Sequence, residues 1–293
     1  MLAETTLGAL AALGSAVTWA VTGLLVRSLM ADLGSVAVNA LRSSVGGALL
    51  VAWVLGTRGI APFASISAGA LALLALSIVA AVTIGDTMFF ESTRALGLGR
   101  AMTVSMTYPV GAALLAAAFL DEPITPALAA GTLLTLGGLT LIVAPWAQRA
   151  PGERFWLGVG TATLASLAWA VSVVFLKSPL GDIEPVTAQA IRLPLAAATL
   201  WVTPWARGAL GRLGRRDPSV LARLAGLSVL NAVSSVMFVA GVKHAGVAVA
   251  TVLSSTAPMF AIPLAVVFLG ERLSLGALLG AAVTLAGIVV LQL

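Results

Sequence analysis

The sequence contains no cysteine and a single histidine, His244, among its 293 residues. Without thiols it cannot form disulfides, iron–sulfur clusters or thiolate nucleophiles, and one imidazole cannot supply a zinc site that needs several. No cofactor is therefore expected. Charged side chains are also scarce, at 9% of the chain, whereas a soluble domain carries about 25%. There are too few charges to cover a water-facing surface.

Apolar residues make up 60% of the sequence, and the mean hydropathy is +1.08. A helix that crosses a bilayer needs about 20 such residues, so the chain has room for ten spans and none for a separate soluble domain. The runs are apolar on all sides and lack a period of two, which excludes a β-barrel and favours helices. We predict an all-α, polytopic membrane protein with ten transmembrane helices. The predicted spans cover residues 6–29, 35–56, 68–92, 98–120, 126–146, 155–178, 184–206, 220–243, 246–269 and 275–293.

The chain also contains an internal repeat, because residue types that are rare in apolar helices recur at nearly one offset. The matching pairs, at offsets of 150 or 149, are Trp19 and Trp169, Asn39 and Gln189, Arg42 and Arg192, Pro109 and Pro258, and Glu122 and Glu271. The two halves, 1–148 and 149–293, hold five predicted spans each. An odd number makes the second half enter the membrane from the opposite side, so the halves are inverted. Inverted repeats around a midplane site are common in secondary transporters that work by alternating access.

These motifs resemble the drug/metabolite transporter superfamily, in its ten-helix form built from two EamA-type repeats. The resembling segments are Trp19-Ala-Val and Trp169-Ala-Val, Arg42 and Arg192, Thr107-Tyr-Pro109 and Thr256-Ala-Pro258, and Phe119-Leu-Asp-Glu122 and Phe268-Leu-Gly-Glu271. The resemblance implies export or exchange of small metabolites such as amino acids, nucleotides, sugars or drugs. It also implies a basket of helices with a cavity lined by the first four helices of each half, and a peripheral fifth helix.

Charged residues inside the spans are the first candidates for a site, because burying a charge in a bilayer costs at least about 2.5–3.5 kcal/mol. Arg42 and Arg192 lie about one-third into spans two and seven, and with Asn39 and Gln189 they are candidates for binding a substrate carboxylate. The alternative is that each arginine snorkels to the interface or binds carbonyls at a helix end.

Asp86 lies deep in span three, and no basic residue is three or four places away. It is the candidate for binding and releasing a coupling proton. Alternatively, Asp86 neutralises Arg42 or Arg192 across the bundle, or bonds a carbonyl. Glu91 and Arg94 have helical spacing and are interpreted as an interfacial ion pair.

Aromatic and hydroxyl side chains complete the predicted substrate site. Trp19 and Trp169 lie mid-span, where they can stack on a flat substrate or pack between the halves. Tyr108 can donate to a substrate, and Ser254 and Ser255 precede Pro258. The prolines in spans four and nine free carbonyls that can line a cavity, or they make kinks patched by a nearby hydroxyl. A further polar patch in span eight consists of Asn231, Ser234 and Ser235.

The predicted partners are the lipid bilayer, a small-molecule substrate and, if transport is coupled, protons. The net charge of +5 does not indicate nucleic acid, because the basic residues lie between apolar runs. The face of small residues at Gly276 and Gly280, matched by Ala127 and Gly131, predicts close helix packing within a monomer or in a homodimer.

Ten spans place both termini on one side of the cell (inner) membrane. The connections that follow odd-numbered spans carry most of the arginines, so the positive-inside rule predicts that the termini lie outside. The family resemblance implies termini in the cytoplasm, and the two expectations stand side by side.

The function that these features indicate is a secondary transporter of a small, amino-acid-like metabolite, with export implied by the resemblance and proton coupling at Asp86. The alternative is a multidrug exporter of organic cations. An enzyme is disfavoured because the sequence lacks facing acids, a Gly-x-Ser-x-Gly motif and a His-Glu-x-x-His motif. A passive channel is disfavoured because the spans lack charge rings or a continuous polar stripe.

Overall fold

The computed structural model describes residues 2–96, 101, 104–143, 154–206, 208–213, 217–257, 259–260 and 275–290. Over these residues the chain forms helices and no strands. Five helical segments are long and apolar enough to cross a membrane. They are Ala3–Met30, Ser35–Arg58, Ala68–Leu96, Phe155–Gly181 and Pro218–Ala245. Shorter apolar helices, Tyr108–Phe119, Pro126–Leu141 and Leu279–Val290, lie in three of the other predicted spans, and the all-α, polytopic membrane fold is confirmed.

Each predicted span contains at least one helix. The first half consists of α1 (Leu2–Leu33), α2 (Ser35–Arg58), the short α3 (Ala61–Ala64), α4 (Ala68–Ile78), η1 (Val79–Asp86), α5 (Thr87–Leu96), α7 (Tyr108–Phe119) and α8 (Pro126–Val143). The second half consists of α9 (Phe155–Lys177), η3 (Ser178–Gly181), α10 (Pro185–Val202), η4 (Pro204–Ala206), α11 (Ala209–Leu213), α12 (Pro218–Ala245), α13 (Val247–Ser254) and α15 (Leu275–Val290). Gly34 and Gly246 separate adjacent helices with φ of 82° and 86°, a backbone conformation that glycine adopts readily.

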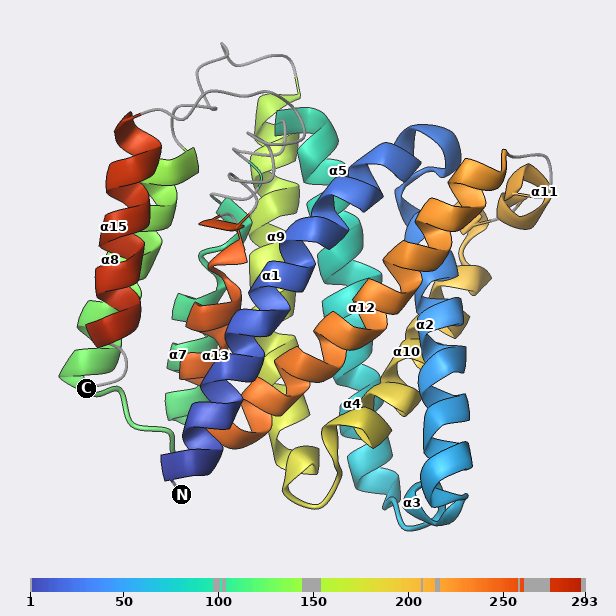
Figure 1. The fold of residues 1–293 in the computed structure, drawn as a ribbon, viewed down its shortest axis with the longest axis horizontal. Helices are drawn as coiled ribbons and strands as arrows, with labels where there is room; N and C mark the ends of the chain where they lie inside the picture. The colour runs from blue at the N-terminus through green and yellow to red at the C-terminus, as the bar shows by residue number, and fades with distance from the viewer. Residues whose placement is uncertain are drawn as a thin grey trace.

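The two halves run in opposite directions through the bundle. In Figure 1, α1 runs up the view and its counterpart α9 runs down, and the same reversal relates α2 to α10 and α8 to α15. Both chain ends lie at the bottom of this view. The inverted repeat predicted from the odd span count is therefore confirmed.

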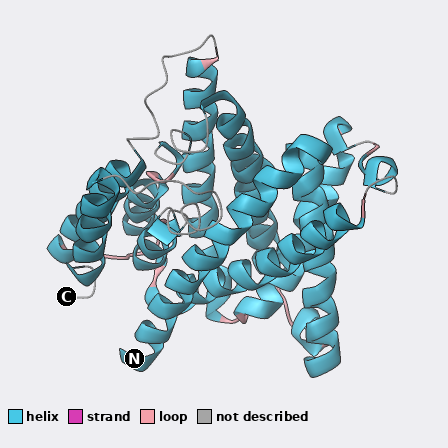
Figure 2. Ribbon diagram, turned by 45° about the horizontal axis from the view of Figure 1, so that its top comes forward, coloured by secondary structure: helices cyan, strands magenta, loops and turns pink. Residues whose placement is uncertain are grey.

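Contacts between the halves follow the same symmetry. Helix α1 packs on α12, and α5 with η1 packs on α9, so equivalent pairs of spans meet twice. The remaining equivalent helices meet each other: α2 packs on α10, α7 on α13, and α8 on α15. Helices α8 and α15 stand together at one side of the molecule, away from the crossing of α1 and α12 (Figure 2).

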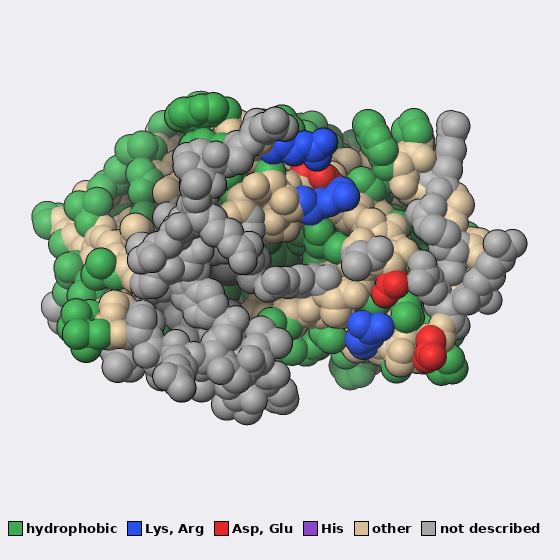
Figure 3. Space-filling model, turned by 90° about the horizontal axis from the view of Figure 1, so that it is seen from above, with side chains coloured by type: hydrophobic (Ala, Val, Ile, Leu, Met, Phe, Trp, Pro, Cys, Tyr) green, Lys and Arg blue, Asp and Glu red, His purple; other side chains and the backbone are tan. Residues whose placement is uncertain are grey.

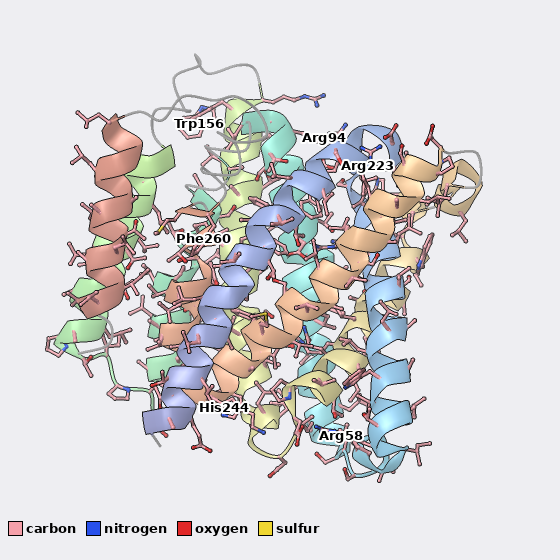
Figure 4. All side chains as sticks on the ribbon, viewed as in Figure 1. Arg58, Arg94, Trp156, Arg223, His244 and Phe260 are labelled. Carbon is pink, nitrogen blue, oxygen red and sulfur yellow. The ribbon has the colours of Figure 1, made fainter. Side chains whose placement is uncertain are left out.

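The outer surface suits a lipid environment. Large apolar side chains are exposed along the helices, among them Leu7, Trp53, Leu133 and Val202. The face seen from above in Figure 3 carries neighbouring basic and acidic side chains. The predicted ion pair of Glu91 and Arg94 is confirmed, with an N–O distance of 3.3 Å, and Arg94 lies near the top of the view in Figure 4. Trp156 lies near this face (Figure 4), as expected for an interfacial indole.

The helix of span four is interrupted just before Pro109. The chain turns at Met106 and Thr107, and α7 begins afresh at Tyr108 with Pro109 in its first turn. Proline is tolerated there because a helix leaves its first amide groups without intrahelical partners. The Thr107 hydroxyl donates to the carbonyl of Val104 at 2.7 Å, which patches the break. The equivalent Pro258 and the segment 261–274 with Glu271 lie outside the described residues.

Candidate substrate site

A cavity of about 150 Å³ lies between the two halves. Its polar lining comes from both of them: Ser15 and Trp19 of α1, Asp86 of η1, Tyr108 of α7, Trp169 and Ser172 of α9, Gln189 and Arg192 of α10, Asn231, Ser234 and Ser235 of α12, and Ser254 of α13. Apolar side chains such as Met106 and Phe238 fill the intervening wall. Neither α8 nor α15 contributes a described lining residue.

Asp86 reaches this cavity from the end of a π-helical segment. Residues Val79–Asp86 form π rather than α turns, and such segments are frequent at functional sites. One carboxylate oxygen of Asp86 pairs with the guanidinium of Arg42. The other accepts a hydrogen bond from Trp169 Nε1 at 3.0 Å. Gly85 makes room for this contact, because a Cβ there would lie 2.5 Å from Trp169 Cδ1 and Nε1.

Arg42 lies behind Asp86 and does not line the cavity. Its side chain is 1% exposed, so it does not snorkel to the interface. Its Nε donates to Asn39 Oδ1 at 2.9 Å, and Asn39 Nδ2 donates to the Val82 carbonyl at 3.0 Å. Its guanidinium carbon also lies 5.5 Å and 5.4 Å from the ring centres of Trp19 and Phe90. Arg42 is thus enclosed by its counter-ion, an amide and two rings, while its Nη1 has no hydrogen-bond partner.

Arg192, the equivalent of Arg42, does line the cavity. Its Nη1 donates to Gln189 Oε1 at 2.7 Å, and its Nη2 donates to Ser172 Oγ at 3.4 Å. Its Nε is buried and has no hydrogen-bond partner. Within the described part of the chain, no carboxylate lies within ion-pair distance of Arg192. The residue that the repeat aligns with Asp86 is Ser235, which is uncharged.

Aromatic rings form one side of the cavity. The Tyr108 and Trp169 rings meet edge to face with centres 5.7 Å apart, and Phe89 packs on Trp169 at 5.4 Å. The Tyr108 hydroxyl lies 2.7 Å from Ser254 Oγ and donates to the Thr251 carbonyl at 3.2 Å. Tyr108 therefore joins α7 to α13 across the two halves at the cavity wall.

The structure brings most of the predicted site residues together. The predicted residues that line the cavity are Trp19, Asp86, Tyr108, Trp169, Gln189, Arg192 and Ser254. Asn39 and Arg42 support Asp86 from behind. Ser255 faces away, and its hydroxyl donates to the Val252 carbonyl at 2.7 Å. Substrate binding by these residues stays a prediction.

Sequence reasoning missed Ser15, Ser172 and Phe238, which also line the cavity. One signal was available for Phe238, since the offset of 149 aligns it with Phe89. No comparable signal marks the two serines, because single hydroxyls commonly bond the helix backbone. Ser15 illustrates this ambiguity, since its hydroxyl donates to the Ala12 carbonyl at 2.7 Å.

Two inverted five-helix halves around a shared cavity define the architecture of a secondary transporter. The model of the EamA-like transporter family matches the chain twice, over residues 6–144 and 156–293. The chain belongs to this family, and it is a membrane transporter of the drug/metabolite type.

Two further comparisons found similar proteins. An uncharacterized protein of Pseudomonas aeruginosa is 34% identical over 146 residues, a match that covers 50% of this chain and 49% of that protein. The match thus spans about half the length of that relative, which carries no assigned activity. A solved crystal structure aligns with a TM-score of 0.78 at 18% identity, covering 98% of both chains, and this likeness shows the fold alone.

Proposed function

We propose that this transporter exports small, amino-acid-like metabolites across the cell (inner) membrane by alternating access, with proton coupling at Asp86. The observation that carries the proposal is the cavity between the inverted halves, which combines a carboxylate, a guanidinium and indole rings. Arg192 complements the acid of an amino-acid-like compound, and the indole rings complement its apolar side chain. Rocking one half against the other would expose the cavity to each side in turn.

The contacts of Asp86 support a link between protonation and movement. Its carboxylate holds Arg42 of α2 and Trp169 of α9, so it joins the two halves. A proton on Asp86 would remove the charge that holds Arg42 and would weaken the hydrogen bond from Trp169. Uptake and release of that proton would therefore alter the contact between the halves.

Counterflow in proteoliposomes tests the proposal. We expect vesicles loaded with an unlabelled amino acid to accumulate the labelled form, with a rate that depends on pH. Asp86→Asn should abolish the pH dependence. Since this variant leaves Arg42 as an unpaired buried cation, it should be compared with the double variant Arg42→Gln/Asp86→Asn, which removes both charges. Unchanged pH dependence in folded samples of both variants would reject coupling at Asp86.

The alternative function is an exporter of organic cations. It needs an available carboxylate in the cavity, and Asp86 is the acid that lines it within the described residues. Because Asp86 already accepts from Arg42 and Trp169, the geometry supports the amino-acid-like substrate better. Competition of counterflow by organic cations, without competition by amino acids, would favour the alternative.

A further inference from the structure

The cavity departs from the two-fold symmetry of its frame at one position. The repeat aligns Arg42 with Arg192, Trp169 with Trp19, and Asn39 with Gln189. It aligns Asp86, however, with Ser235. The first half therefore supplies both a guanidinium and its counter-ion, whereas the second half supplies the guanidinium alone.

The hydrogen bonds of the two arginines differ, because Ser235 in the second half stands at the position equivalent to Asp86. In Arg42, Nε binds Asn39 and Nη2 binds Asp86, so the Nε–Nη2 edge is filled. In Arg192, it is Nη1 rather than Nε that donates to the side-chain amide of Gln189. The Nε of Arg192 has no partner, and its Nη2 has only the 3.4 Å contact with Ser172. The same edge of the guanidinium is thus unfilled in the second half.

The charge balance of the buried groups also indicates an anion site at Arg192. Arg192 is 3% exposed and lines the cavity, and arginine stays protonated in proteins. Asp86 balances Arg42, so the three groups together carry one uncompensated positive charge. The isolated charge of a buried arginine is costly unless an anion accompanies it. Trp19, whose ring packs against Arg42, also lines the cavity.

We propose that the carboxylate of the substrate binds the Nε–Nη2 edge of Arg192. It acts as the counter-ion of Arg192, as Asp86 acts as the counter-ion of Arg42. This inference rests on the proposed transport function and narrows its substrate class to compounds with a carboxylate. A carboxylate matches this edge with two parallel hydrogen bonds. By the symmetry of the repeat, the Trp19 indole N–H donates to it as Trp169 donates to Asp86. With the substrate bound, the arginine of each half has a carboxylate partner.

Ser235→Asp tests this idea, because it places a carboxylate where the repeat aligns Asp86. We expect the variant to pair with Arg192 and to occupy the site itself. Its melting temperature without ligand should rise, and its response to carboxylate ligands should weaken by about tenfold or more. Ser235→Asn is the matched control, since it has the same shape without the charge and should still respond.

Thermal-shift assays of the purified full-length protein test which ligands bind. The probes are carboxylates of increasing size, and the control for each is its own primary amide. We expect at least one carboxylate to stabilise the protein, and its neutral amide not to do so. Arg192→Gln should remove the response, and Trp19→Phe should reduce it. The inference is overturned if no carboxylate stabilises the protein, if amides act equally well, or if Ser235→Asp keeps the full response.

Counterflow separates this inference from the proposed function. Binding of carboxylates at Arg192 without counterflow would overturn transport and leave the binding site intact. Counterflow that carries amines or neutral compounds, and ignores carboxylates, would overturn the binding site and leave transport intact.

Discussion

Gly85 lets the Trp169 indole reach Asp86, because a Cβ at this position would overlap the pyrrole edge of the indole. Gly85→Ala should therefore displace Trp169 and break its 3.0 Å hydrogen bond to Asp86. We expect a loss of about 1–3 kcal/mol in the free energy of unfolding, as for other overpacked sites. Thermal unfolding in detergent measures this effect.

Gly56→Ala is the matched control. Gly56 also lies within a helix, but a Cβ there meets no atom within 4 Å. Alanine should be neutral or slightly stabilising at that position, because it restricts the unfolded chain. Equal losses at Gly85 and Gly56 would contradict the role assigned to the indole contact.

Helices α8 and α15 meet through a pair of glycines that the repeat aligns. A Cβ on Gly138 would overlap Thr284 and Gly280, and a Cβ on Gly287 would overlap Thr135 and Gly131. Gly131 and Gly280, two of the small residues recognised in the sequence, therefore pack within the monomer. Close backbone approach of this kind holds helices together where lipid supplies no hydrophobic drive.

Gly138→Val should separate α8 from α15 at a cost of about 1–3 kcal/mol. The neighbouring Gly137→Val provides an internal control, since a Cβ on Gly137 meets nothing within 4 Å. Melting temperatures of the two variants should differ clearly. Similar values would show that the helices can repack without loss.

Glu122 stabilises the start of α13 from the opposite half of the chain. Its carboxylate accepts from the amides of Val247 and Ala248 at 3.0 Å and 3.3 Å. Lys177 lies 3.9 Å from it and donates to the Val242 carbonyl at 2.9 Å, near the end of α12. Glu122 therefore binds the N-terminus of α13, and Lys177 binds a carbonyl near the C-terminus of α12, on either side of Gly246.

Glu122→Ala should destabilise the protein by about 0.5–2 kcal/mol, the usual cost of removing a helix cap. Glu122→Gln should lose less, because the amide oxygen can still accept while the charge at the helix N-terminus is gone. Unfolding measurements on both variants, with Asp182→Asn as an exposed acidic control, check the order. A larger loss for Gln than for Ala would refute the capping role.

The two faces of the whole molecule differ in their available positive charge. Arg94 and Arg223 lie on the upper face of Figure 4, and Arg58 lies on the lower one with the chain ends. The ammonium groups of Lys177 and Lys243, near that lower face, bind backbone carbonyls at 2.9 Å and 3.1 Å. The positive-inside rule therefore favours a cytoplasmic upper face.

Cysteine labelling checks this orientation, and the absence of native cysteine removes any background. Ile60 precedes α3 on the lower face, and Leu210 lies in α11 on the upper face, and both side chains are exposed. A membrane-impermeant maleimide should label Ile60→Cys in intact cells and Leu210→Cys only after permeabilisation. The reverse pattern would place the termini in the cytoplasm, as the family resemblance implies.

The fold was predictable because its signals are local or repeated. Apolar runs give the spans. Tryptophan, arginine and glutamate at offsets of 150 or 149 give the repeat, and its odd span count gives the inversion. The site was predictable where the repeat marks a residue, as for Trp19 and Arg192, or where a rare polar type lies inside a span, as for Asp86 and Tyr108. The pairing of Arg42 with Asp86 joins residues that are 44 positions apart. It depends on how α2 meets a π-helical segment, which leaves no periodic trace in the sequence.

That π-helical segment occurs in one half only, since the equivalent stretch of α12 is a regular α-helix. A perfectly duplicated carrier would have inward-open and outward-open forms of equal energy. Under the proposed alternating access, the two forms would differ because the π-helical segment has an α-helical equivalent in the other half. We then expect the empty protein to prefer one orientation, and its apparent substrate affinity to differ between the two sides of the membrane.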